Sequence, residues 1–148
     1  MKTIKIGMIG FGTIGAGVAK ILSENSEIIQ KRLGAKVELV KVADLDITTD
    51  RGIKLAPNVL TTSAEEVINH PDITVLIELM GGYELARKFL LQAIEQGKHV
   101  VTANKALLAK HGDELFSAVA EKGLSIGYEA SIGGAIPIIR SVREAFVA

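Results

Sequence analysis

Three glycines near the start of the chain have a spacing suited to binding a nucleotide diphosphate. They stand in the segment Gly10-Phe11-Gly12-Thr13-Ile14-Gly15, between an apolar run at residues 4–9 and a stretch of helical periodicity. Gly10 permits a tight turn, Gly12 lets the main chain approach a pyrophosphate, and Gly15 lets the helix pack closely on the strand. The start of the helix adds unpaired N–H groups and a partial positive charge. A glycine-rich turn that binds nothing is the alternative, and the strand–loop–helix context disfavours it.

A carboxylate follows the second apolar run, residues 37–42. Asp44 at this place can accept hydrogen bonds from both hydroxyls of an adenosine ribose and repels a 2′-phosphate, which favours NAD. The alternative is a solvated turn carboxylate, the role that we assign to Asp46. Arg51 and Lys54 follow in the next loop and could meet a 2′-phosphate, so the choice between NAD and NADP stays open.

Two charged residues follow later strands at the same edge of the predicted sheet. Lys105 could touch a cofactor phosphate or ribose, or a substrate oxygen. The alternative is a surface lysine at a helix start, which the helix dipole disfavours. Glu129 ends the sixth predicted strand, and with carbonyls of residues 131–136 it could hold a hard cation. Its carboxylate could equally be satisfied by N–H groups of that loop.

Three further residues stand at or near the end of the fourth predicted strand. Gly81 and Gly82 would let a dinucleotide approach the main chain, although a plain turn explains them as well. Glu78 lies within an apolar run and needs a partner if it is buried, so we interpret it as structural. The three histidines show no ligand spacing with one another.

Alternating strands and helices must position these residues. The expected strands are residues 4–9, 37–42, 59–61, 75–79, 99–102 and 124–129. The expected helices are residues 12–24, 27–33 after Ser26 as N-cap, a short one after Ser63 with Glu66 in a capping box, 84–96 with Leu85 on its core side, 113–122, and one with Ile138, Val142 and Phe146 on its apolar face. Right-handed crossovers then give an α/β fold, a Rossmann-type doubly wound parallel sheet in the order 3-2-1-4-5-6.

The composition suits such a sheet. Hydrophobic residues make up 48% and aromatic ones 4%, as expected for aliphatic strands buried on both faces. The 17 basic and 17 acidic residues cancel without a basic cluster, so we expect no nucleic-acid partner. The absence of cysteine excludes disulfides, Cys-ligated zinc and a thiolate nucleophile in this chain. The first apolar run is too short for a signal peptide or a membrane span, which predicts a cytoplasmic protein and no membrane partner.

Three further segments, in this order, carry a resemblance to a known family. They are Glu78-Leu79-Met80-Gly81-Gly82, then Val101-Thr102-Ala103-Asn104-Lys105-Ala106-Leu107-Leu108-Ala109, then Tyr128-Glu129-Ala130-Ser131-Ile132-Gly133-Gly134-Ala135-Ile136-Pro137-Ile138-Ile139. With the glycine segment they resemble homoserine dehydrogenase over the whole of this chain. The resemblance implies an oxidoreductase that interconverts L-aspartate 4-semialdehyde and L-homoserine with NAD or NADP, on the route to threonine and methionine.

The resemblance also implies roles for single residues. Thr13 and Ile14 would contact the cofactor pyrophosphate, and Gly81 would lie beside the dinucleotide. Thr102 and Lys105 would face the nicotinamide, with Lys105 as the candidate catalytic residue.

A sodium-binding turn is implied as well, formed by Glu129 and the main chain of Ile132, Gly134 and Ile136. Here Gly133-Gly134-Ala135 replaces the Ala-Gly-Gly order of the family. Main-chain carbonyls can still ligate a cation with this change.

The likeness covers only the N-terminal part of that enzyme. We expect residues 1–130 to form the cofactor-binding domain and residues 131–148 to begin the connection to a substrate domain, which would hold the acid–base lysine. The chain alone should bind the dinucleotide weakly and turn over little or no homoserine, and the full-length enzyme is expected to be a homo-oligomer. The alternatives are another Rossmann oxidoreductase of amino-acid metabolism and a non-catalytic module that senses nucleotides.

Overall fold

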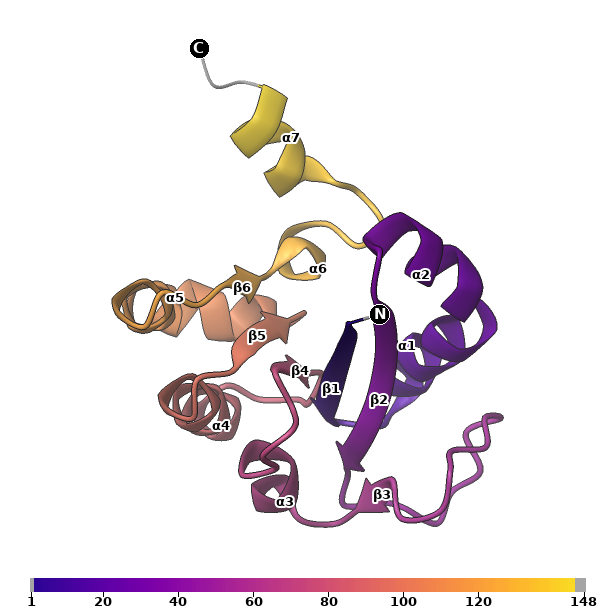
Figure 1. Ribbon diagram of the computed structural model, residues 1–148. Coiled ribbons are helices and arrows are strands. Elements are labelled where there is room, and N and C mark those ends of the chain that lie inside the picture. Colours follow the sequence, from indigo (N-terminus) through magenta and orange to yellow (C-terminus); the bar gives the residue numbers. More distant parts are fainter. Residues whose placement is uncertain (1, 146–148) are drawn as a thin grey trace.

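A computed structural model describes residues 2–145. Its six-stranded sheet has the order β3-β2-β1-β4-β5-β6, and every neighbouring pair is parallel, as predicted (Figure 1). The strands are β1 (Thr3–Ile9), β2 (Lys36–Ala43), β3 (Leu60–Thr61), β4 (Val75–Glu78), β5 (His99–Thr102) and β6 (Ile126–Gly127). The order reverses between β1 and β4, and ligands of such sheets bind at the carboxyl ends beside this point.

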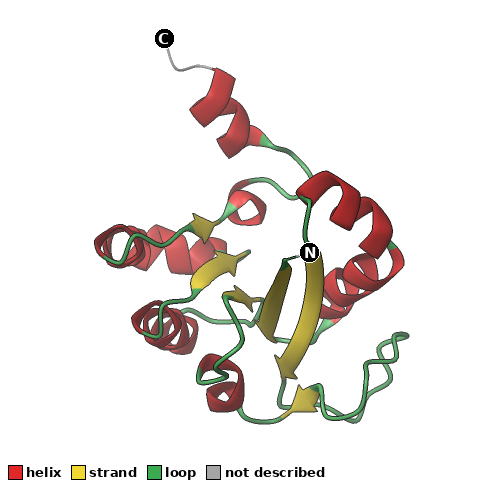
Figure 2. Cartoon of the chain, viewed as in Figure 1, coloured by secondary structure: helices red, strands yellow, loops and turns green. Residues whose placement is uncertain are grey.

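Helices cover both faces of the sheet. They are α1 (Thr13–Glu24), α2 (Ser26–Leu33), α3 (Ala64–Ile68), α4 (Glu84–Glu95), α5 (Lys105–Glu121), α6 (Glu129–Ile132) and α7 (Ile138–Ala145). Figure 1 shows α1 and α2 on one side, and α3, α4 and α5 on the other. Short connections join most of these elements, whereas a long loop separates β2 from β3 (Figure 2).

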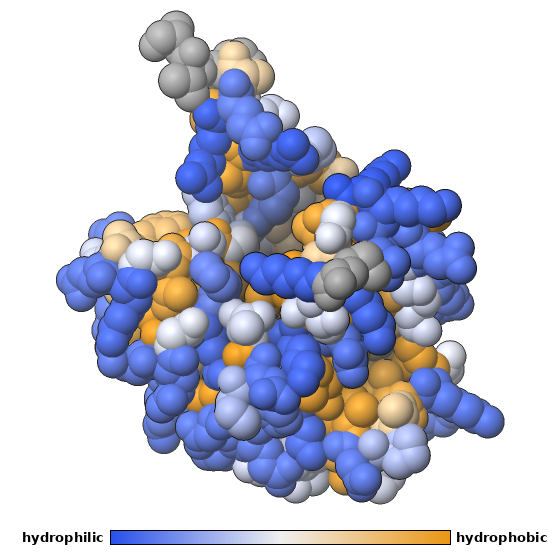
Figure 3. Space-filling view, viewed as in Figure 1, coloured by the Kyte–Doolittle hydropathy of each residue, from blue (hydrophilic) through white to orange (hydrophobic). Residues whose placement is uncertain are grey.

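Two apolar clusters fill the space between sheet and helices. The larger one lies against α3, α4 and α5, and the smaller one lies against α1. Met8, Leu76 and Val100, on neighbouring strands, are at most 1% exposed. The face seen in Figure 3 is mostly hydrophilic, with apolar patches between the charged side chains. None of the helices within residues 2–145 is long and apolar enough to cross a membrane.

The helix after β5 is longer than predicted. It begins at Lys105 rather than near Asp113, because the side chain of Asn104 accepts a hydrogen bond from the amide of Leu107 at 3.0 Å and so caps the first turn. Non-helical angles at His111 (φ −130°, ψ 16°) divide the helix. The sequence pattern identified only the part after this kink.

Of two predictions of local structure at helix N-termini, one was wrong and one was half right. The N-cap of α2 is Asn25 and not Ser26, which is the first helical residue. Ser63 does cap α3 by accepting from the amide of Glu66. The carboxylate of Glu66, however, accepts from the Thr61 hydroxyl at 2.9 Å instead of completing a capping box.

Other differences concern exposure and strand length. Leu85 is 49% exposed rather than part of the core. The sixth strand contains only Ile126 and Gly127, so Glu129 does not end it and instead begins α6. Phe146, expected on the apolar face of the last helix, lies outside the described residues.

Candidate functional site

The three glycines of the loop at residues 10–15 have different surroundings. Gly10 has φ +101°, and a Cβ there would stand 2.5 Å from the Leu79 carbonyl oxygen. A Cβ at Gly15 would stand 2.2 Å from the carbonyl oxygen of Gly10, which confirms the close approach of helix and strand. A Cβ at Gly12, the N-cap of α1, would meet no atom of the described chain within 4 Å. The fold therefore requires glycine at residues 10 and 15, whereas Gly12 leaves open space in front of a helix start.

A groove of about 480 Å³ adjoins this open space. Such a volume is typical of a small-molecule site. It lies at the carboxyl ends of β1, β2 and β4, beside the point where the strand order reverses. Its lining residues are Ile9, Gly10, Gly12, Ala43, Asp44, Leu45, Thr62, Ala64, Glu65, Leu79, Met80, Gly81, Leu85 and Phe89.

Asp44 lies at the rim of the groove, against the glycine loop. One carboxylate oxygen accepts a hydrogen bond from the main-chain amide of Phe11, and the other accepts from the amide of Asp46 at 2.9 Å. A carboxylate oxygen can accept more than one bond, so both retain capacity for a ribose hydroxyl. The loop and the carboxylate that follows the second strand are thus brought together.

Asp46 has the turn role that was predicted for it. Its carboxylate accepts from the amides of Thr48 and Thr49, at 3.1 and 3.0 Å, and from the guanidinium of Arg51 at 3.0 Å. Hydrogen bonds from Thr49 and Thr48 hold the pKa of Asp46 far below its ordinary value. Arg51, a candidate for binding a 2′-phosphate, is therefore already paired with a carboxylate.

The residues implied at the pyrophosphate and beside the dinucleotide lie at the surface. Thr13 is exposed, and Ile14 is 60% exposed on the first turn of α1. A Cβ at Gly81 would meet no atom of the described chain within 4 Å, whereas Gly82 has φ +78°. Each of the two interpretations of this glycine pair therefore applies to one residue. Gly82 adopts the backbone conformation of a turn, and Gly81 leaves space at the groove.

Glu78 has the structural partners that its burial demands. It is fully buried, and its oxygens accept from the Thr102 hydroxyl at 2.6 Å and from the Met80 amide at 2.8 Å. Burial raises the pKa of Glu78, and the hydrogen bonds from Thr102 and Met80 oppose that rise. Sequence reasoning missed the bond to Thr102. The strand register would have revealed it, because the two residues are direct partners at the ends of β4 and β5.

Thr102 and Lys105 differ in what they can offer a ligand. Thr102 is 1% exposed, and its hydroxyl donates to Glu78 and accepts from the Asn104 amide at 3.0 Å. Lys105 is the exposed first residue of α5. Within residues 2–145 its ammonium group has no hydrogen-bond or ion-pair partner, so it is available to a ligand at this edge.

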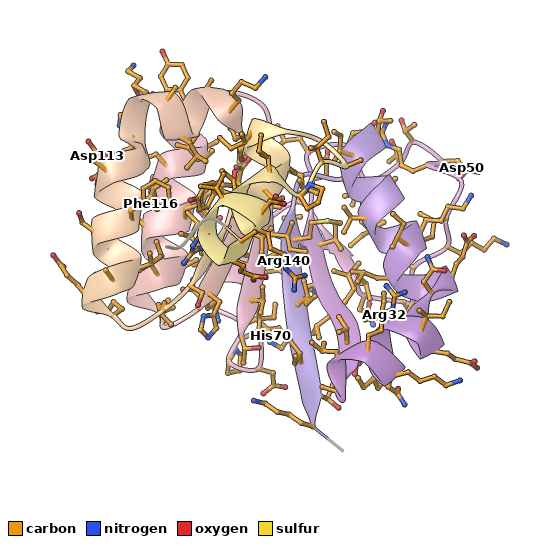
Figure 4. The ribbon with its side chains drawn as sticks, turned by 90° about the horizontal axis from the view of Figure 1, so that it is seen from above. Arg32, Asp50, His70, Asp113, Phe116 and Arg140 are labelled. Carbon is orange, nitrogen blue, oxygen red and sulfur yellow. The ribbon has the colours of Figure 1, made fainter. Side chains whose placement is uncertain are left out.

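The Glu129 carboxylate is satisfied by main-chain donors. It accepts from the amide of Ile139 at 3.0 Å and from that of Arg140 at 3.3 Å, both in the first turn of α7. The alternative to cation binding that the sequence had left open placed these donors in the loop at residues 131–136, whereas they come from α7 beyond that loop. Figure 4 shows Phe116 on α5, and its ring meets that of Tyr128, which precedes Glu129, at 5.1 Å between centroids.

One carbonyl of the candidate cation turn already accepts a hydrogen bond. The Ile136 carbonyl accepts from the amide of Ile138 at 2.8 Å, and Ile132 and Ile136 are 50% and 59% exposed. Ala135, where the family pattern implies glycine, has φ 61°. Within the described part of the chain, no three acidic or histidine side chains gather into a metal site. A cation here would depend on main-chain carbonyls.

Comparisons with known proteins agree on one family. The family described as "Homoserine dehydrogenase, NAD binding domain" matches residues 10–129. The homoserine dehydrogenase of Bacillus subtilis is 42% identical over 144 residues, which is 97% of this chain and 33% of that protein. This chain therefore spans about a third of the length of the curated relatives that it matches.

Solved structures show the same likeness. A homoserine dehydrogenase from Thiobacillus denitrificans superposes with a TM-score of 0.91 at 42% identity, over 98% of this chain and 33% of that one. A hyperthermophilic archaeal homoserine dehydrogenase, solved in complex with NADPH, has a TM-score of 0.76 at 23% identity, over 95% of this chain and 48% of that one. The second likeness concerns the fold alone.

Proposed function

This chain belongs to the family of homoserine dehydrogenase NAD-binding domains, and from that premise we propose that it serves an enzyme interconverting L-aspartate 4-semialdehyde and L-homoserine with NAD(P)(H). The observation that carries the proposal is the open space at Gly12. It lies at a helix start, beside a groove at the point where the strand order reverses.

The proposed pose follows the two halves of the sheet. The adenosine half occupies the groove, with its ribose on Asp44, and the pyrophosphate meets the loop at residues 10–15, including Thr13 and Ile14. The nicotinamide half extends past Gly81 toward Thr102 and Lys105 at the ends of β4 and β5. Such a sheet is built from two mononucleotide-binding halves, which supports this division.

A nicotinamide held here would supply the acceptor for the hydride that leaves C4 of homoserine. This chain's contribution is to bind and orient that ring. Lys105, with its ammonium group at the open edge, would hold a cofactor or substrate oxygen and stabilise negative charge developing on it. The lysine that takes the hydroxyl proton is expected in the substrate domain, so the chain alone should not turn over homoserine.

NAD is the proposed cofactor, because Asp44 presents a carboxylate to the ribose and Arg51 is paired with Asp46. Fluorescence titration of the chain with NADH and with NADPH tests this assignment. We expect NADH to bind at least as tightly as NADPH. Clearly tighter binding of NADPH would refute the choice of NAD, and binding of neither would refute the dinucleotide site.

The activity can be tested by exchange with a relative. This chain would replace the corresponding third of the Bacillus subtilis enzyme, and the chimera would be assayed for homoserine-dependent reduction of NAD or NADP. We expect turnover, and a large loss on Lys105→Ala with NADH binding kept. A chimera that binds NADH but never oxidises homoserine would contradict the proposed reaction, and unchanged turnover would contradict the role of Lys105.

A sodium ion at the turn of Glu129, Ile132, Gly134 and Ile136 extends the proposal. A carboxylate and several carbonyls are the ligands that a hard cation takes, which supports the site, although Glu129 and Ile136 also hold main-chain amides. Melting curves in sodium chloride and in choline chloride at equal ionic strength test it. Sodium should raise the melting temperature, and identical curves would remove the ion from the proposal.

The proposal also assigns residues 1–130 to the cofactor domain and residues 131–148 to the start of a connection to a substrate domain. The position of α7, which projects from the rest of the chain in Figure 1, supports this division. We propose further that the full-length enzyme is a cytoplasmic homo-oligomer. Light scattering on the full-length protein tests the oligomer, and limited proteolysis that cuts near residue 130 would support the boundary.

A further inference from the structure

A fully buried carboxylate stands in the middle of the carboxyl edge of the sheet. Glu78 ends β4, which lies between β1, the strand leading into the glycine loop, and β5, the strand leading to Lys105. Its oxygens accept from the Thr102 hydroxyl at 2.6 Å and from the Met80 amide at 2.8 Å. It therefore touches the loop after β4 and the last residue of β5, which both border the proposed nicotinamide side.

Further hydrogen bonds link Thr102 to the start of α5. The Thr102 hydroxyl accepts from the Asn104 amide at 3.0 Å, and the Asn104 side-chain oxygen caps the helix at Leu107, also at 3.0 Å. The Asn104 amide group donates to the carbonyl of Gly82, at 2.5 Å, across the gap between the two loops. Lys105 directly follows Asn104, so its main chain is fixed by this set of bonds.

The same set of hydrogen bonds also fixes the loop that contains Gly81 and Gly82. Glu78 holds the Met80 amide, and Asn104 holds the Gly82 carbonyl, so Gly81 lies between two tethered residues. Gly81 is also the glycine that leaves open space at the groove. Both main-chain segments that face the nicotinamide half are thus tied to one carboxylate.

A carboxylate suits this position because each of its oxygens accepts one of the observed hydrogen bonds. Both Glu78 oxygens face donors, and an ionised carboxylate presents acceptors alone. A glutamine of the same size would keep an acceptor oxygen for the Met80 amide but would turn its NH₂ group toward the Thr102 hydroxyl, so the hydrogen bond that Thr102 now donates would be lost. A carboxyl group in an apolar setting is also unfavourable unless its bonds are made. A role limited to filling space would be met by an apolar side chain.

We propose that Glu78 is a positioning residue that sets Gly81 and Lys105 for the nicotinamide half of the dinucleotide, acting through Thr102 and Asn104. This inference rests on the proposed function and adds a residue to it. The proposed ribose contact at Asp44 shares no bond with Glu78, although Met80 and Gly81 line the same groove as Asp44. Loss of the carboxylate should therefore weaken the nicotinamide half more than the adenosine half, because Thr102, Asn104 and Lys105 lie on the nicotinamide side.

The test compares two ligands on one variant by calorimetry with the 148-residue chain. NADH carries both halves of the cofactor, and ADP-ribose lacks the nicotinamide. We expect Glu78→Gln to weaken NADH binding by about tenfold or more, as for a misplaced charged contact, and to change ADP-ribose binding by less than about twofold. Glu121→Gln, an exposed carboxylate near the end of α5, is the matched control and should leave both affinities unchanged.

The possible results separate the hypotheses. Equal losses of NADH and ADP-ribose binding, or no loss of either, would overturn the positioning role. Failure of the unmodified chain to bind either ligand would instead overturn the proposed function. If Glu78→Gln does not fold, Thr102→Val removes the same link while keeping the shape of the side chain, and it should show the same selective loss. A Thr102→Val chain that keeps full NADH affinity would overturn the inference.

Discussion

At the residue scale, close contacts with main-chain atoms explain why Gly10 and Gly15 must be glycine. The carbonyl oxygen of Gly10 lies where a Cβ of residue 15 would need to be, 2.2 Å away. We expect Gly15→Ala to lower the free energy of unfolding by about 2 kcal/mol, because helix and strand must move apart. Gly17, in the same helix with open space around it, is the control. Gly17→Ala should raise that free energy by about 1 kcal/mol, and urea unfolding measures both. A Gly15→Ala chain as stable as the unmodified one would show that the approach is relaxed easily.

The pairing of Arg51 with Asp46 makes a residue-scale prediction about cofactor choice. Asp46→Ala frees the guanidinium next to the proposed ribose site, since the Asp46 amide is itself bound to Asp44. We expect NADPH affinity to rise roughly fivefold, through a charge-assisted bond to the 2′-phosphate, and NADH affinity to change little.

Two further variants isolate that effect. Adding Arg51→Ala to Asp46→Ala should abolish the gain in NADPH affinity. Asp50, labelled in Figure 4, lies in the same loop. Asp50→Ala removes a charge from this loop and leaves Arg51 in place. A gain of similar size with Asp50→Ala would mean that general charge, and not the freed arginine, attracts the phosphate.

The sequence could identify single residues where their own type is diagnostic. The spacing of Gly10, Gly12 and Gly15 predicted a nucleotide loop, and the place of Asp44 after the second strand predicted a ribose contact, because each of these signals depends only on position along the chain. The bond between Glu78 and Thr102 was not found, because it depends on the register of two strands that are 24 residues apart. Such pairings are properties of the folded sheet.

Element ends show a similar division at the next scale. The pattern of α4 was clear, and Gly97, with φ +76°, follows the end of this helix. The first half of α5 was missed because His111 and Gly112 interrupt its periodicity, whereas the cap at Asn104 depends on a side-chain bond. The sixth strand was overestimated because an apolar run does not show where a strand loses its neighbour.

The turn between α6 and α7 supplies an element-scale prediction. Ala135 has φ 61°, in the left-handed region that disfavours a residue with a Cβ. We expect Ala135→Gly to raise the free energy of unfolding by about 0.5–1 kcal/mol, because relief of strain exceeds the greater chain entropy of glycine. Ala130→Gly, inside α6, should instead lower it. Thermal unfolding measures both, and a loss of stability in both variants would contradict the strained turn.

At the scale of the whole molecule, alternating strands and helices were enough to predict the sheet. Handedness and the glycine loop restrict the order to one solution, and that order is confirmed. Which helix faces which side was not evident from composition, since both faces of the sheet are apolar. The groove follows from this arrangement, because it forms only where β1, β2 and β4 end together.

Ion pairs of four surface carboxylates should make the stability of the molecule depend on pH in the acid range. Bonds from Lys41, Lys5, Lys110 and Arg87, in that order, lower the pKa values of Glu66, Asp72, Glu84 and Glu114. Their ordinary values are 3.8 for Asp and 4.5 for Glu. Between ordinary and lowered values the unfolded chain binds more protons, so stability rises with pH. The stabilisation that these groups contribute is complete above their ordinary pKa values, and it is lost as the pH falls through their lowered pKa values.

We therefore expect the melting temperature to fall progressively below pH 4.5, and less steeply in high salt, because these pairs are exposed. Glu114→Gln should reduce the slope, because it removes one of the lowered groups, and Glu121→Gln should not. A melting temperature that stays constant as the pH is lowered from about 5 to about 3 would show that these ion pairs contribute nothing.

The most direct test of the whole account is NADH affinity of the Gly12→Ala chain, measured by calorimetry beside its melting temperature. The fold leaves room for this Cβ, and the proposed pyrophosphate does not. We expect binding to weaken at least about tenfold with no loss of thermal stability, while Gly17→Ala binds as the unmodified chain does. Unaltered NADH affinity in Gly12→Ala would mean that no diphosphate rests on this loop.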